Sequence, residues 1–235
     1  MAVRINKFIS ETGFCSRREA DKLVADGKVT INGVVAELGS QAEMGDDVRI
    51  NSRPIADASK HVYILLNKPV GITCTTESHV PGNIVDFINH KERIFPIGRL
   101  DKDSEGLILL TNDGDIVNRI LRAEGRHEKE YIVTVNRPIT PQFLQGMASG
   151  VRILGAMTLP CTVTRISERE FRIILTEGKN RQIRRMCQAF GYEVRKLRRI
   201  RIMNIHLGTQ RVGTWRDLTP AEKAELGKTL QYQLG

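Results

Sequence analysis

The sequence predicts an α+β fold, with a small N-terminal helix–helix–hairpin module followed by a larger domain built on a mixed, mainly antiparallel sheet. The first 50 or so residues carry two short helical patterns and a tight hairpin signal. From His61 onward, apolar β-type runs recur with helices between them, at spacings too irregular for alternating βαβ units. An apolar content of 40% over 235 residues is sufficient for a buried core.

The N-terminal module is predicted from capping and turn signals. Ser16 and Glu19 stand at the spacing of a capping box, which opens a helix that Gly27 ends. Asn32-Gly33 suits the type I′ turn of a two-residue hairpin, because both of its central residues need positive φ. The expected elements are helices over 4–11 and 16–26 and strands over 29–31, 34–35 and 47–50.

A linker is predicted over residues 51–60, which are polar and interrupted by Pro54. It divides the chain into a domain of residues 1–58 and a domain of residues 61–235. In the second domain we expect strands over 62–66, 107–110, 131–135, 171–175 and 194–205, and helices over 115–121, 141–147, 180–190 and 220–230.

Positive charge is concentrated in one segment of the chain. The formal net charge is +9, and the window from Lys179 to Arg201 holds nine Lys or Arg against one acid, Glu193. Clustered cations are typical of proteins that bind a polyanion, because neutralised phosphates release condensed counterions. A solvated basic face without a partner is the alternative interpretation.

Four scattered cysteines and a polar N-terminus limit the classes of protein to which the chain could belong. The cysteines contain no C-x-x-C pair, which disfavours a disulfide framework or a zinc site and favours reduced thiols in the cytoplasm. No apolar stretch is long enough for a signal peptide or a membrane span. We therefore expect a soluble cytoplasmic protein that has no contact with a membrane.

An acidic turn precedes one of the predicted strands. Asp101, Asp103 and Glu105 alternate before Gly106, as in a calcium-binding loop. That loop requires a glutamate at its twelfth position, where this sequence has Asn112, and it also requires flanking helices rather than strands. We therefore predict no metal site here, and an ordinary acidic turn remains the simplest structural interpretation.

Four short motifs point to a known family. They are K-P-V-G at 68–71, G-R-L-D at 98–101, H-E-K-E-Y at 127–131 and E-G-K-N-R-Q-I-R at 177–184. Together, and in this order, they resemble the signature of the RNA pseudouridine synthases. The resemblance spans essentially the whole chain and is greatest to the ribosomal branch that acts on the large-subunit RNA.

The resemblance implies roles for individual residues. Asp101 would be the catalytic carboxylate, Tyr131 would lie against the target base and Arg184 would pair with Asp101. A guanidinium suits that pairing because it keeps its proton when buried. Leu197 matches a leucine that packs near the aspartate, and Arg99 would fill the gap left by a flipped base. For Tyr131 and Leu197, simple core packing is the alternative.

The resemblance also implies partners and cofactors. Residues 4–33 look like the small RNA-binding module of a small-subunit ribosomal protein and of bacterial tyrosyl-tRNA synthetases, whose second helix presents basic residues to RNA. The expected RNA-contacting residues are Arg4, Lys7, Arg17, Arg18, Lys22, Arg99, Lys179, Arg181, Arg185, Arg198 and Arg199. The implied partner is 23S ribosomal RNA, with a transfer RNA left open as a second substrate. We expect a monomer without a cofactor, because the isomerisation involves no redox change.

Two other classes of protein compete with this interpretation. A non-catalytic RNA-binding ribosome assembly factor would share the N-terminal module, but it would gain nothing from Asp101 in a basic cleft, where a carboxylate repels phosphate. A metal-dependent nuclease would need convergent carboxylates or histidines. Asp101, Asp103 and Asp113 are close in sequence, but strand alternation and the intervening turn predict no convergent set.

Overall fold

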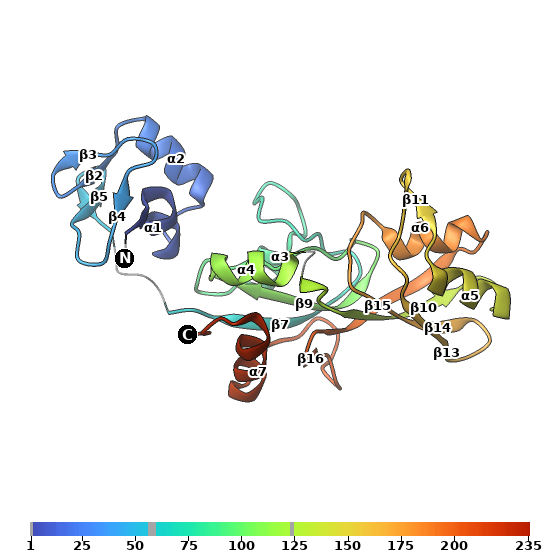
Figure 1. The fold of residues 1–235 in the computed structure, drawn as a ribbon. Helices are drawn as coiled ribbons and strands as arrows, with labels where there is room; N and C mark the ends of the chain where they lie inside the picture. Colours follow the sequence, from blue (N-terminus) through green and yellow to red (C-terminus); the bar gives the residue numbers. More distant parts are fainter. Residues whose placement is uncertain (1, 56–59, 123–124) are drawn as a thin grey trace.

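The computed structural model describes residues 2–55, 60–122 and 125–235, and it confirms the α+β class. The N-terminal module lies at one end of the molecule, and helices α5 and α6 lie at the other (Figure 1). The helices are α1 (Ile5–Glu11), α2 (Arg17–Ala25), α3 (Ile84–Ile88), α4 (Gly114–Leu121), α5 (Pro141–Ser149), α6 (Gln182–Ala189) and α7 (Pro220–Leu230). Among these helices of the described chain, none is long and apolar enough to cross a membrane.

The N-terminal module packs two helices against short strands. Its strands are β1 (Val3–Arg4), β2 (Val29–Ile31), β3 (Val34–Val35), β4 (Gln41–Ala42), β5 (Val48–Ile50) and β6 (Arg53–Pro54), with β3-β2-β5-β6 as one sheet and β1-β4 as a pair. The predicted capping box is present, because the Ser16 hydroxyl accepts from the Glu19 amide and the Glu19 carboxylate accepts from the Ser16 amide. Asn32 and Gly33 have φ of 50° and 81°, as the predicted hairpin turn requires.

The first half of the predicted linker belongs instead to this sheet. Asn51 and Ser52 have φ of 49° and 65° and turn the chain, so that β6 pairs with β5. Pro54 is compatible with this place because β6 is an edge strand. Residues 56–59 of the predicted linker lie outside the described residues.

The larger domain is built on one mixed sheet. In the described chain its strands are β7 (Tyr63–Lys68), β8 (Phe95–Pro96), β9 (Glu105–Thr111), β10 (Lys129–Val135), β13 (Thr162–Arg165), β14 (Glu170–Leu175), β15 (Val194–Ile202), β16 (Ile205–His206) and β17 (Trp215–Asp217). Their order is β13-β14-β10-β15-β9-β7-β17, with β16 on β15 and β8 on β9. Within this sheet β9 and β15 run parallel and the other neighbours antiparallel, which confirms the predicted mixed and mainly antiparallel arrangement.

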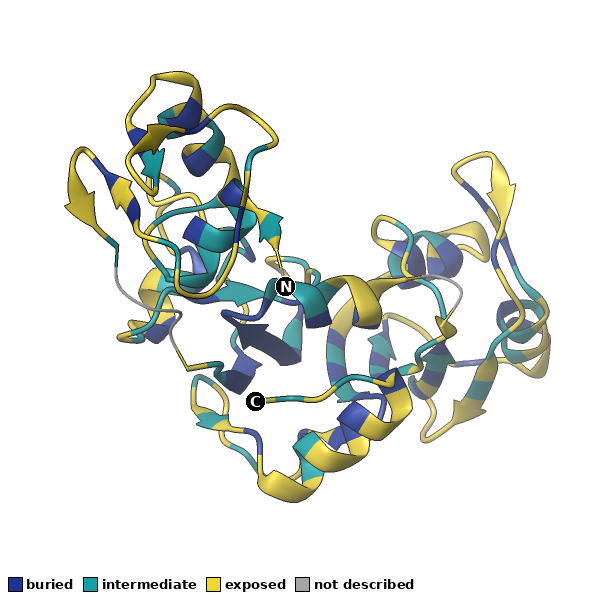
Figure 2. Ribbon diagram, turned by 60° about the vertical axis from the view of Figure 1, so that its left-hand side comes forward, coloured by how far each residue is buried: buried dark blue, intermediate teal, exposed yellow. Residues whose placement is uncertain are grey.

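Helices cover both faces of this sheet, so residues 63–66 of β7, which point alternately to the two faces, are all buried. On β7, Ile64 and Leu66 belong to the core that includes residues of α3, α5 and α6, whereas Tyr63 and Leu65 belong to the core that includes residues of α4 and α7. The alternation follows from the two-residue period of a strand. Figure 2 shows buried positions concentrated along the sheet and on the helix sides that face it.

Three features of this domain differ from the sequence prediction. The single strand expected over 194–205 is two strands, because Met203, with φ of 52°, lies in the turn that brings β16 back onto β15. α6 begins at Gln182 rather than at residue 180, because Arg181 has left-handed backbone angles. Elements that were not predicted from the sequence are α3, β8, β13 and β17, and the separate hairpin of β11 (Arg152–Ile153) and β12 (Ala156–Met157).

Candidate active site

A pocket of about 770 Å³ opens beside the loop between β8 and β9. This size lies within the range of roughly 300–1,000 Å³ that is usual for small-ligand sites. Its lining includes Asp101 on that loop, Tyr131 on β10, Leu197 and Arg199 on β15, and Arg181 at the start of α6. The pocket therefore collects side chains from all the segments that carry the later sequence motifs.

Two arginines from the start of α6 face Asp101. Arg181 Nη1 and Arg184 Nε lie 3.6 Å and 4.0 Å from Asp101 Oδ2. Arg184 is held in place because its Nη2 donates to the Asp103 carbonyl and to Ser104 Oγ, both at 3.0 Å. The Arg184 side chain is 14% exposed and that of Asp101 31%. Arg184, the predicted partner of the carboxylate, thus lies beside it together with Arg181, at ion-pair rather than hydrogen-bond distance.

Arg181 is engaged more strongly by Asp103 than by Asp101. Its Nη1 and Nη2 donate to the two carboxylate oxygens of Asp103 at 3.1 Å and 2.9 Å, a bidentate pair. The hydrogen bond from Arg181 holds the pKa of Asp103 below its ordinary value, against the opposing effect of burial. Arg181 was predicted to contact RNA, and in the structure this pair fixes its guanidinium at the mouth of the pocket.

Residues 177–182 form a loop that is held together by hydrogen bonds from its own side chains. Glu177 Oε1 accepts from Gln182 Nε2 at 2.7 Å and from the Leu159 amide at 2.9 Å, and Lys179 pairs with the other carboxylate oxygen. Gln182 Oε1 accepts from the Lys179 amide. Burial alone would raise the pKa of Glu177, but the Lys179 ammonium and these donors hold it below its ordinary value. The loop sets where α6 begins, and therefore where Arg184 lies.

The K-P-V-G segment supports the loop that carries Asp101. Lys68 is fully buried, and its ammonium donates to the carbonyls of Pro69 at 2.9 Å and Ile72 at 3.0 Å. Burial lowers the pKa of Lys68. The Gly71 amide donates to the Lys102 carbonyl at 2.7 Å, which joins this turn to the residue that follows Asp101.

Tyr131 lies opposite Arg199 in the pairing of β10 with β15. Tyr131 is 9% exposed, and the Arg199 guanidinium lies 6.0 Å from the centroid of its ring. Leu197, on the same strand, is 6% exposed. Arg199 is only 4% exposed and lines the pocket, so the RNA contact predicted for it would lie inside the pocket and not on the outer surface. Gly106 on β9 allows β15 to approach closely at Arg199, because a Cβ at position 106 would collide with the Arg199 backbone carbonyl.

The other predicted RNA-contacting residues fall into two groups. The exposed ones are Arg4, Arg17, Arg18, Lys22 and Arg99. The paired ones are Lys7 with Asp115 at 2.6 Å, Lys179 with Glu177, Arg185 with the Asn180 side chain and carbonyl, and Arg198 with Glu105 at 4.0 Å. The first group is available to a polyanion without breaking an existing contact, whereas the second is not.

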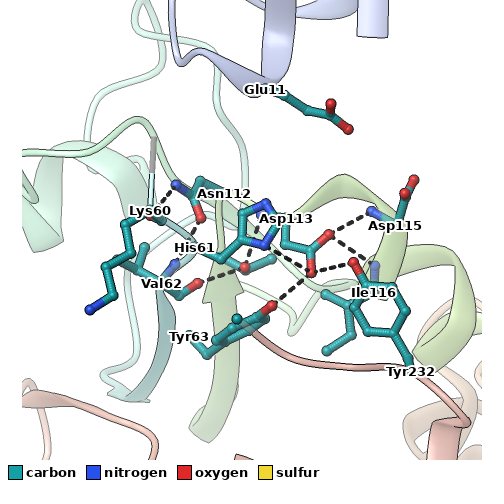
Figure 3. Close-up of polar contacts among 12 residues, drawn as sticks. Glu11, Lys60, His61, Val62, Tyr63, Asn112, Asp113, Asp115, Ile116 and Tyr232 are labelled. Carbon is teal, nitrogen blue, oxygen red and sulfur yellow. Dashed lines mark hydrogen bonds and ion pairs between the residues drawn. The ribbon is translucent and has the colours of Figure 1, made fainter. Parts of the chain in front are cut away.

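Asp113 belongs to a separate polar cluster, as Figure 3 shows. Its side chain caps α4 and accepts from the hydroxyls of Tyr63 at 2.8 Å and Tyr232 at 2.9 Å. Burial, followed by the bond to Asp113, raises the pKa of Tyr63. Within residues 2–55, 60–122 and 125–235, no three His, Cys, Asp or Glu side chains gather as ligands for a metal ion.

Sequence reasoning missed Lys129 as a pocket residue. It lies two residues before Tyr131 on β10 and lines the same pocket. Its position in the sequence could have indicated this, because residues i and i+2 of a strand share one face and Lys129 lies two residues before Tyr131.

The chain matches two family models. The model described as RNA pseudouridylate synthase matches residues 62–189, and the S4 domain model matches residues 3–48. The dual-specificity RNA pseudouridine synthase RluF of Escherichia coli (strain K12) is 56% identical over 232 residues, covering 98% of this chain and 80% of that protein. The ribosomal large subunit pseudouridine synthase B of Bacillus subtilis (strain 168) is 36% identical over 95% of both chains. A crystal structure of a pseudouridylate synthase superimposes with a TM-score of 0.70 at 29% identity, covering 97% of this chain and 99% of that one.

Proposed function

This chain belongs to the RNA pseudouridine synthase family, and on that basis we propose that it converts a specific uridine of 23S ribosomal RNA to pseudouridine. The observation that carries the proposal is the position of Asp101 in a pocket beside Tyr131, with Arg184 facing its carboxylate. The large subunit is supported by the name of the relative from Bacillus subtilis.

The reaction breaks the N1–C1′ bond of uridine, rotates the uracil and joins C5 to C1′. N1 gains a proton and C5 loses one, so atoms and electrons balance without an oxidant, and we propose that no cofactor takes part. Asp101 acts as the nucleophile, or as the base that removes a proton at C2′. Arg184 lies beside the Asp101 carboxylate as a counter-ion and orients it, and Tyr131 stacks on the uracil and relays the proton lost from C5.

The target uridine enters the pocket from a looped-out or flipped conformation. A base inside a helix cannot reach Asp101, so it must leave its stack, and a side chain must support the gap. Arg99 suits this role because it is exposed at the edge of the pocket, two residues before Asp101.

The two parts of the chain divide the work in this proposal. Residues 1–58 bind RNA through the exposed Arg17, Arg18 and Lys22 of α2, and residues 61–235 perform the chemistry. The separate core of the N-terminal module, drawn from residues 5–55, supports this division. Deleting residues 1–58 should weaken binding to structured ribosomal RNA and leave a folded catalytic domain. An insoluble or molten fragment would contradict the division.

The substrate is tested by mapping pseudouridines in ribosomal RNA from cells with and without this gene. We expect one 23S uridine to lose its modification in the deletion strain and to regain it from the wild-type gene but not from Asp101→Asn. Unchanged 23S modification would contradict the proposal and favour the ribosome assembly factor. Transfer RNA from the same cells should be mapped as well, because a relative at 56% identity is a dual-specificity enzyme.

A further inference from the structure

Two cations line the pocket next to Tyr131 and form what we call the cationic corner, Lys129 and Arg199. Lys129 precedes Tyr131 by two residues on β10, so both side chains project from one face of the sheet. Arg199 lies directly opposite Tyr131 on β15. Three pocket-lining side chains from two adjacent strands therefore meet in one place.

The hydrogen bonds that Lys129 and Arg199 donate go to neutral backbone carbonyls. Lys129 Nζ donates to the His127 carbonyl at 3.2 Å. Arg199 Nε donates to the Leu107 carbonyl at 2.7 Å, and its Nη1 reaches the Arg99 carbonyl at 3.4 Å. Arg199 Nη2 is buried without a hydrogen-bond partner. Among the described residues, no carboxylate oxygen lies within 4.0 Å of either cation to form an ion pair.

Burial together with the lack of a counter-charge distinguishes the corner from the other cations of the pocket. Arg99, Lys102 and Arg122 also line the pocket without an ion-pair partner among the described residues, but they are exposed, whereas Lys129 is half-buried and Arg199 is buried. Lys179 has Glu177 and Arg181 has Asp103 as ion-pair partners. Seven of the described lining residues are Lys or Arg and two are Asp or Glu, so the pocket as a whole favours an anion. Burial, followed by the charge of Arg199, lowers the pKa of Lys129, which is the effect expected of two cations that share a partly desolvated site.

We propose that Lys129 and Arg199 bind a phosphate group of the substrate RNA adjacent to the target uridine. Uracil is neutral, so it cannot compensate two positive charges, whereas a phosphodiester supplies a full negative charge and several acceptor oxygens. This subsite rests on the proposed function, because it assumes that the uridine lies between Tyr131 and Asp101. Holding the adjacent phosphate would fix the ribose in relation to Asp101 and lower the cost of orienting it.

The test compares uridine 5′-monophosphate with uridine, which differ by the phosphate alone, as ligands of the full chain in calorimetric or NMR titrations. Wild-type protein should bind the monophosphate at least about tenfold more tightly, as one charge-assisted contact provides. Lys129→Met should remove most of that preference and leave the affinity for uridine within about twofold. Lys129→Arg should retain it. Lys228→Met is the matched control, since it removes one exposed lysine on α7, far in the sequence from the pocket segments.

Several results would overturn the proposal. They are equal affinities of the two ligands for wild-type protein, no measurable binding of the monophosphate at millimolar concentration, and an unchanged preference in Lys129→Met. An equal loss of both ligands in Lys129→Met would also overturn it, since that pattern indicates a contact with the base or a structural role. The readout needs no turnover, so the preference can persist even if the mapping of ribosomal RNA contradicts the proposed function. The two failures are therefore distinguishable.

Discussion

Arg184 directs its Nε at Asp101 across 4.0 Å, and that nitrogen is buried without a hydrogen-bond partner. The neighbouring Nη2 is already engaged by Asp103 and Ser104, which fixes the plane of the guanidinium. A small movement of the carboxylate would turn this ion pair into a charge-assisted hydrogen bond. Such tightening is usual when substrate completes an active site, because catalytic contacts are often long without it.

Arg184→Met should therefore lower kcat by about 10²–10³-fold, the usual effect of removing one electrostatic contact in an active site. Affinity for RNA should stay within a few-fold, because Arg184 is mostly buried. Single-turnover kinetics and filter binding would measure the two quantities. Arg169→Met removes an exposed arginine between β13 and β14 and serves as the control. A decrease in affinity with an unchanged rate would mean that Arg184 binds RNA and does not support Asp101.

Gly106→Ala should destabilise the pairing of β9 with β15. Gly106 has φ of +111°, and a Cβ there would collide with the Arg199 backbone. A clash of this kind in a packed core costs about 2 kcal/mol, which lowers Tm by roughly 4–8 °C in a chain of this size. Gly178→Ala is the control, because its Cβ would meet nothing within 4 Å. An unchanged Tm for Gly106→Ala would contradict the parallel pairing.

Glu177 should contribute to stability at neutral pH and lose that contribution in acid. Its pKa in the folded protein is held below the ordinary value of 4.5, although burial opposes the shift. A depressed carboxyl pKa stabilises the fold above the unfolded pKa, and the stabilisation disappears as pH falls through the folded pKa. Urea unfolding from pH 7 down to about pH 3 should show a smaller acid-induced loss for Glu177→Gln than for wild type. The exposed Glu168→Gln should follow wild type, and an identical curve for Glu177→Gln would contradict the assignment.

Arg17 and Arg18 should contribute to affinity through phosphate contacts. For single-stranded or looped RNA, each neutralised phosphate adds about −0.7 to the slope of log K against log salt. Replacing both residues with alanine should flatten the slope by about 1–1.5 and leave the saturated rate nearly unchanged. Lys28 and Arg49, which pair with Asp26 and Asp47 in the same module, provide a control double variant. A loss of the saturated rate with an unchanged salt slope would mean that Arg17 and Arg18 do not contact RNA phosphates.

Local signals predicted the fold best where one side chain determines the backbone. The Ser16–Glu19 capping box and the Asn32-Gly33 turn are both present, and α7 has the predicted bounds. The turn at Met203 was missed because Met followed by Asn is not a sequence signal for a hairpin, whereas Asn-Gly is. Strand β17 was missed because it is short and half exposed, without an apolar face.

The candidate site was predictable through its motifs and much less so through charge. Asp101, Tyr131 and Arg184 come from three distant segments, which the resemblance identified and the sheet brings into one region. Charge alone did not show that Arg199 is buried and lines the pocket, because a basic run does not reveal which of its residues point inward. Lys129 was missed for the same reason, because the role proposed for it depends on Arg199, which lies on the neighbouring strand β15.

The central claim is that the Asp101 carboxylate performs the chemistry. Asp101→Asn keeps the size of the side chain and removes its nucleophilicity and basicity. We expect it to abolish pseudouridine formation in a single-turnover assay on 23S RNA, with RNA affinity within a few-fold of wild type, because phosphate contacts dominate binding. Residual turnover within about tenfold of wild type would contradict the account, since catalysis by a carboxylate could not survive its replacement to that degree.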